Sequence, residues 1–171
     1  MNYLYDRYKR DSGFYNEHNM YNKNIFISEV PVNKENGRME LYVFEDRGQE
    51  PVEDALITIY ARTGATTSVP VKSFKTTREP IFIELPVAHP QGQLIKGPEY
   101  YFTTYNMTIE SKEYFRVTVY NIRLFPNITS KFDYNLNTTA TDVPNQEEII
   151  YIPPHLRDRI NGQNYYGNNK L

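Results

Sequence analysis

The sequence RMELYVFEDRGQEPVEDALITIYAR, residues 38–62, alternates apolar and polar side chains on both sides of a turn. The apolar side chains recur at every second position, at Met39, Leu41, Val43, Ala55, Ile57 and Ile59. A period of two predicts half-buried β-strands. Between the two segments, Gly48 and Pro51 favour a turn. The stretch therefore predicts a β-hairpin.

The region after this stretch continues the same pattern. Further strands are expected at residues 71–75, 80–85, 100–110, 114–125 and 128–137. The strands at 100–110 and 114–125 should form a second hairpin, in which Asn121 interrupts the alternation between Val119 and Ile122. Such an interruption predicts a β-bulge at Tyr120 and Asn121. No window has helical periodicity, so about seven strands in roughly 100 residues predict an all-β fold, a single Greek-key β-sandwich.

Composition narrows the classes of function. Sixteen Tyr and nine Phe supply the aromatic side chains, and there is no Trp. Nineteen basic and 21 acidic residues give a net charge of -2 without any run of Lys or Arg, so we expect no nucleic-acid partner. The absence of Cys excludes disulfides, thiolate catalysis and Cys-ligated metals.

The first residues are too polar for the apolar core of a secretory signal. No apolar run approaches the roughly 20 residues that a membrane-spanning helix requires. We therefore expect cytoplasmic synthesis without a signal peptide and no membrane span. A location outside the cell would then be reached by lysis, by assembly from inside or by a signal-free route.

Residues 1–37 are rich in Asn and Tyr, have no helical periodicity, and are predicted to form an extended N-terminal arm ahead of the sandwich domain at 38–137. Within the arm, a weakly alternating segment contains Ile25, Phe26, Ile27, Val30 and Val32. This segment would pair either with its own sheet or with the sheet of a neighbouring copy.

Residues 138–171 are predicted to form a C-terminal arm. Its apolar run consists of Ile149, Ile150, Tyr151 and Ile152 and ends at two prolines, which stop a β-ladder. The run would be either an edge strand of its own sheet or a strand lent to another copy. These residues and those of the N-terminal segment are the predicted subunit interface.

The loop at 86–98 is long and contains three prolines. A loop of this length is typical of a functional loop or of a connection between sheets. We name His89, Gln91 and Tyr100 as its candidate ligand contacts.

Two segments carry a resemblance to a known family. The run G-x-M-E-L-Y-V-F from Gly37 and the run E-P-V-E-D-A-L-I-T-I at 50–59 resemble the opening of the carboxypeptidase regulatory-like, or transthyretin-like, β-sandwich. Residues 98–109 and 114–130 are similar to the version in clostridial spore cortex-lytic and peptidoglycan-binding proteins. The resemblance covers about residues 37–137 and implies an accessory or assembly module without catalytic residues. Asp54 stands where the family usually has Gly, which implies a different turn in the same fold.

Nothing in the sequence predicts catalysis. His18, His89 and His155 lie in separate segments without His or carboxylate neighbours at metal-ligand spacing. No Gly-rich phosphate loop and no G-x-S-x-G motif occurs. We therefore expect no enzyme activity, no cofactor and no metal.

Two functional hypotheses remain. In the first, the chain is a structural subunit that assembles with copies of itself into a filament or surface layer, plausibly on an endospore, through exchanged arms. In the second, it is an accessory module that recognises a cell-wall glycan or a partner protein through exposed Tyr faces or the 86–98 loop. Both place the protein outside the cell or on the spore surface.

Overall fold

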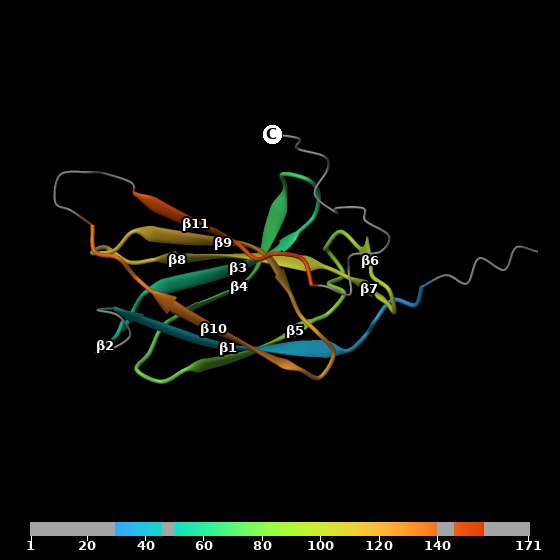
Figure 1. Cartoon of the computed structure of the whole chain (residues 1–171), viewed down its shortest axis with the longest axis horizontal. Coiled ribbons are helices and arrows are strands. Elements are labelled where there is room, and N and C mark those ends of the chain that lie inside the picture. The colour runs from blue at the N-terminus through green and yellow to red at the C-terminus, as the bar shows by residue number, and fades with distance from the viewer. Residues whose placement is uncertain (1–29, 46–49, 140–145, 156–171) are drawn as a thin grey trace, which may run out of the picture.

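The computed structural model describes residues 30–45, 50–139 and 146–155, and these residues fold entirely into strands and loops (Figure 1). The strands are β1 (Asn36–Glu45), β2 (Glu50–Pro51), β3 (Leu56–Arg62), β4 (Ser68–Lys75), β5 (Ile81–Pro86), β6 (Ile95–Lys96), β7 (Tyr101–Phe102), β8 (Thr104–Glu110), β9 (Arg116–Arg123), β10 (Thr129–Asn135) and β11 (Glu147–Tyr151). The all-β prediction is confirmed. The predicted count of seven strands is too low, because additional strands form in the turn after β1, in the 86–98 loop and near the C-terminus. The predicted strand at 100–110 is also divided into β7 and β8.

The strands form two main sheets. The four-stranded sheet has β1 at its centre, with β10 on one side and β2 and β5 on the other. The five-stranded sheet has the order β11-β9-β8-β3-β4. Strands β6 and β7 form a small separate pair.

The hydrophobic core lies between the two main sheets. The largest fully buried side chains come from both layers and include Met39, Leu41, Ile57, Ile59, Tyr105, Met107 and Ile109. All six positions that the alternation of residues 38–62 assigned to one face are buried. A period of two thus identified the core face of both strands.

The predicted hairpin over residues 38–62 is wrong in its pairing. Strand β1 belongs to the four-stranded sheet and β3 to the five-stranded sheet. The partner of the end of β1 is the short β2, where Phe44 faces Pro51. The chain then crosses between the layers, because alternation specifies which face of a strand is buried but not which strand lies beside it.

Asp54 lies in this crossing and has a φ of 60°. Its N–H donates to the carbonyl of Thr76 at 3.1 Å, and the N–H of Ala55 donates to the Thr76 hydroxyl at 2.9 Å. A positive φ favours glycine, although Asp tolerates it better than most residues. This conformation occurs at the position where the family that the sequence resembles usually has Gly.

The second predicted hairpin and its bulge are confirmed. Strands β8 and β9 pair antiparallel, with a register shift between Tyr105 and Met107 of β8. Opposite that shift, Asn121 has a φ of 66°, and its N–H donates to Asn106 Oδ1 at 3.3 Å. Tyr120 and Asn121 of β9 are thus the two residues of the bulge, opposite Asn106 of β8.

The described parts of both predicted arms form backbone hydrogen bonds with the rest of the structure. Near the N-terminus, Tyr101 donates its N–H to the carbonyl of Pro31 at 3.0 Å, and Val87 donates to Glu35 at 2.9 Å. Near the C-terminus, β11 pairs parallel to β9. Within residues 30–45, 50–139 and 146–155, no helix has the length and hydrophobicity that spanning a bilayer requires.

Candidate functional site

A large hollow lies on the face of the five-stranded sheet that points away from the core. It has a volume of about 1000 Å³ and is formed by β3, β8, β9 and β11, the loop after β3 and the segment after β11. We call it the outer groove, and its chemistry is carried by Tyr60, Arg62, Asn106, Thr108, Tyr120 and Tyr151. Because four strands contribute side chains, the groove exists only in the assembled sheet.

Tyrosines from three strands line the middle of the groove. Tyr60 of β3 faces Asn106 of β8, and Tyr120 of β9 faces Tyr151 of β11. The rings of Tyr120 and Tyr151 stack with centroids 5.1 Å apart and planes inclined by 17°. We call Tyr60, Asn106, Tyr120 and Tyr151 the aromatic row.

Hydroxyl side chains form a second row beside the aromatic row. Thr58, Thr108 and Thr118 face one another across β3, β8 and β9. The Thr118 hydroxyl donates to Glu147 Oε1 at 2.5 Å, and Ser73 donates to Thr58 at 3.1 Å. The hydroxyl of Thr108 is different, because it is buried without a hydrogen-bond partner among the described residues. Thr108 is 6% exposed and lines the groove.

The charged groups of the groove are engaged within the protein. The Arg62 guanidinium donates to the carbonyls of Gly64 at 2.8 Å and Ala65 at 3.2 Å, so it braces the loop after β3. Arg116 pairs with Glu110 at 3.3 Å. With Glu147 bonded to Thr118, both signs of charge occur in the groove. Charge of one sign therefore does not dominate the outer groove, which suits a neutral, polar ligand.

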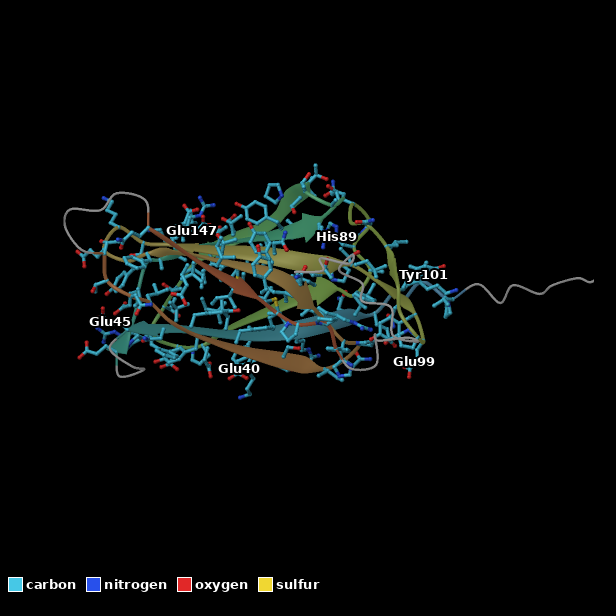
Figure 2. The ribbon with its side chains drawn as sticks, turned by 45° about the horizontal axis from the view of Figure 1, so that its top comes forward. Glu40, Glu45, His89, Glu99, Tyr101 and Glu147 are labelled. Carbon is cyan, nitrogen blue, oxygen red and sulfur yellow. The ribbon has the colours of Figure 1, made fainter. Side chains whose placement is uncertain are left out.

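The predicted ligand loop does not belong to the outer groove. His89 Nδ1 accepts the N–H of Gln91 at 3.2 Å, and the His89 N–H donates to Thr103 Oγ1 at 3.1 Å. Burial lowers the pKa of His89. Figure 2 shows His89 toward the end of the molecule that carries Tyr101, whereas Glu147 lies toward Glu45. These bonds fix the shape of the loop.

Tyr100, the third predicted contact of this loop, lies in a different environment. Its ring centroid is 5.5 Å from the guanidinium carbon of Arg123, and Phe102 lies closer to the same carbon, at 3.8 Å. The structure therefore does not bring Tyr100 together with His89 and Gln91 in the outer groove. In the described residues, no group of three or more His, Asp or Glu side chains has the arrangement of a metal site.

The predicted interface residues occupy several positions. Ile25, Phe26 and Ile27 lie outside the described residues. Val30 is half-buried, and Val32 is 48% exposed and forms a bridge with Tyr101.

The predicted interface residues at the C-terminus belong to or follow β11. Ile150 and Ile152 pack against the core, whereas Ile149 and Tyr151 are 50% and 66% exposed. Of the two alternatives for the C-terminal run, this structure has the edge strand of its own sheet.

The groove residues Tyr60, Asn106, Thr108 and Tyr120 were not predicted from the sequence. A signal was present, because the outward positions of β3, β8 and β9 carry Tyr, Thr and Asn where solvated strands usually carry charges. Those positions could be combined into one site only with the strand order and the cross-strand register.

A scan against models of known protein families finds no match to this chain. A search of curated protein sequences also finds no match. The resemblance of residues 37–137 to the transthyretin-like module therefore stays a prediction, and the function must be argued from the outer groove.

Proposed function

We propose that this chain is a non-catalytic module that binds a neutral glycan of the cell wall in the outer groove. The observation that carries this proposal is the buried hydroxyl of Thr108, which has no hydrogen-bond partner in the part of the chain that the structure describes and lies between the strands that bear Tyr60 and Tyr120. A buried polar group without a partner costs free energy, so a ligand that bonds to it recovers that cost.

Sugars fit the chemistry of this groove. A pyranose ring has apolar C–H faces, against which an aromatic ring packs, and an edge of hydroxyl groups. The tyrosines of the aromatic row supply ring surface and phenol groups. Asn106 and Thr108 supply the few convergent polar groups that fix the orientation of a ligand. The length of the row across four strands suits several linked sugars better than one.

The resemblance of residues 37–137 to the transthyretin-like module also supports a glycan ligand. The relatives that it implies are accessory modules of spore cortex-lytic and peptidoglycan-binding proteins, for which a cell-wall glycan is a natural ligand. The positive φ of Asp54, at the family's Gly position, supports a transthyretin-like sandwich with Greek-key connections. We accordingly place the protein on the outside of the cell or on the spore surface.

The test is calorimetric titration of the full chain with oligomers of N-acetylglucosamine, together with co-sedimentation with purified peptidoglycan. Tyr60→Ala should weaken binding about tenfold, which corresponds to about 1.4 kcal/mol. The matched control is Tyr42→Ala, which removes a half-buried tyrosine from the outer face of the four-stranded sheet. Equal loss in the two variants, or no binding by the unmodified chain, would contradict the proposal.

A second candidate function is that of a structural subunit of a filament or surface layer. The specific observation that favours it is the exposure of Ile149 and Tyr151 on β11, the outermost strand of its sheet. Exposed edge strands pair readily with other chains. Electron microscopy of the purified full chain would reveal polymers, and the lack of Cys predicts that reductant would not dissolve them.

A further inference from the structure

The two edge strands of the five-stranded sheet differ in their protection against pairing. Strand β4 carries Pro70, Lys72 and Lys75, which are residues that block edge-to-edge contact. Strand β11 has neither Pro nor Lys, and its exposed side chains include Ile149 and Tyr151. Figure 1 shows β11 at the free margin of the sheet, beside β9. One edge is therefore closed to a partner and the other is open.

The hydrogen bonds of β11 identify which of its backbone groups bond to β9 and which point away from the described sheet. The carbonyl of Gln146 accepts from Arg116, and the N–H of Ile152 donates to Tyr120, both at 3.1 Å. In a regular strand the backbone groups alternate in direction with a period of two, so the even-numbered residues bond to β9. The N–H and C=O groups of Glu147, Ile149 and Tyr151 then point away from the sheet.

These outward groups match a second copy of the same strand. From this arrangement we infer that two copies of the chain pair β11 with β11, antiparallel, around a two-fold axis at Ile149. Ile149 then faces Ile149 of the second copy, and Glu147 faces Tyr151 of the second copy. Each such pair exchanges both of its backbone hydrogen bonds. No carboxylate faces another carboxylate directly, so the register is self-complementary.

The pairing joins two five-stranded sheets into one and closes after two copies, as an isologous contact does. It goes beyond glycan binding and does not rest on it. It limits strand addition through this edge to a closed dimer, because β4 is protected against the head-to-tail contact that would propagate. The side chains of Ile149 and Tyr151 lie on the groove side of the sheet, so two outer grooves would open side by side on one face. A long glycan could then occupy both grooves and gain affinity from bivalency.

The absence of Cys makes a thiol cross-linking test direct. Full-length chain with Ile149→Cys should form a covalent dimer under mild oxidation, because facing hydrogen-bonded residues have Cα atoms about 5.5 Å apart, within the range for a disulfide. The control is Phe82→Cys, which places a thiol at a still more exposed position, on β5 of the other sheet. The register test mixes Glu147→Cys with Tyr151→Cys, and only the mixture should cross-link efficiently.

Sedimentation equilibrium of the unmodified full chain should show a reversible dimer with a Kd on the order of 10–100 µM, because the contact is small. Ile149→Pro should abolish the dimer and leave the circular dichroism spectrum unchanged, since it removes an N–H that points away from β9. The inference is overturned if the unmodified chain stays monomeric near about 1 mM. It is equally overturned if Phe82→Cys cross-links as readily as Ile149→Cys.

Discussion

The ring of Tyr151 stacks on the ring of Tyr120 at 5.1 Å, and this contact joins the C-terminal strand β11 to the outer face of β9. Stacked aromatic pairs contribute about 0.5–1.5 kcal/mol beyond the area they bury. We predict a coupling free energy of about 0.5–1 kcal/mol in a double-mutant cycle of Tyr120→Ala and Tyr151→Ala. Urea unfolding of the four proteins gives the coupling. Strict additivity would show that the stack does not hold β11.

The buried Tyr105 offers a test of the link between the sheets. Its side chain is fully buried, and its hydroxyl donates to the carbonyl of Pro86 at 2.5 Å, so β8 of one sheet is tied to the end of β5 of the other. Burial raises the pKa of Tyr105, so the hydroxyl remains a donor throughout the neutral range. Tyr105→Phe should lower the free energy of unfolding by about 1–2 kcal/mol. Tyr42→Phe, on an outer face, is the control and should change it little.

The positive φ of Asp54 predicts that two small substitutions at this position differ in their effect on the free energy of unfolding. Asp54→Gly and Asp54→Ala both remove the exposed ion pair with Lys75, whose side chains are 80% and 66% exposed. The difference in free energy of unfolding between the two variants therefore reports the cost of the backbone conformation alone. Gly adopts a φ of 60° freely, so Asp54→Gly should be about 1 kcal/mol more stable than Asp54→Ala. If the two variants unfold at the same denaturant concentration and with the same slope, the backbone at residue 54 is not strained.

The sequence predicted which face of a strand is buried better than it predicted which strands pair with each other. Alternation identified the buried faces of β1 and β3, and the broken alternation at Asn121 located the bulge. The sequence did not predict the pairing of β1 with β10, because a parallel partner some 90 positions away produces no pattern in the neighbouring residues. The error over residues 38–62 has the same origin, since turn-forming residues suit a sheet-to-sheet crossing as well as a hairpin.

The outer groove was missed for a related reason. Tyr60, Asn106, Tyr120 and Tyr151 are unremarkable outward positions when each strand is considered alone. They become one row through three separate registers, and the bulge on β9 shifts the register between β8 and β9. His89 and Gln91 were predicted as ligand contacts because a long loop is typical of a functional loop, whereas the single hydrogen bond between them stabilises the loop itself.

The lowered pKa of His89 predicts a pH dependence of stability. Desolvation disfavours the charged imidazole in the folded state, whereas the unfolded chain binds a proton near the ordinary value of about 6.5. The contribution of neutral His89 is therefore complete above that pH, and stability falls as the pH drops below it, until the folded pKa is reached. Thermal unfolding between about pH 5.5 and 7.5 should show this decline.

The control for this titration is His89→Asn, which keeps an acceptor for the N–H of Gln91 but does not titrate. The two other histidines remain in both proteins, so the difference between the two pH profiles isolates His89. Profiles that stay parallel across the window would show that His89 takes up its proton equally in both states.

Thr108 and Thr118 face each other on β8 and β9, but their hydroxyls should have opposite effects on stability. The Thr118 hydroxyl bonds to Glu147, so Thr118→Val should destabilise the fold by about 1–2 kcal/mol. The Thr108 hydroxyl is buried without a partner among residues 30–45, 50–139 and 146–155, so Thr108→Val should be neutral or stabilising by up to about 1 kcal/mol. The same substitution should weaken glycan binding, because the ligand loses a bond that only this hydroxyl makes. A stabilised variant with reduced affinity is the signature of a group kept for binding. A destabilised Thr108→Val with unchanged affinity would assign the hydroxyl to the fold instead.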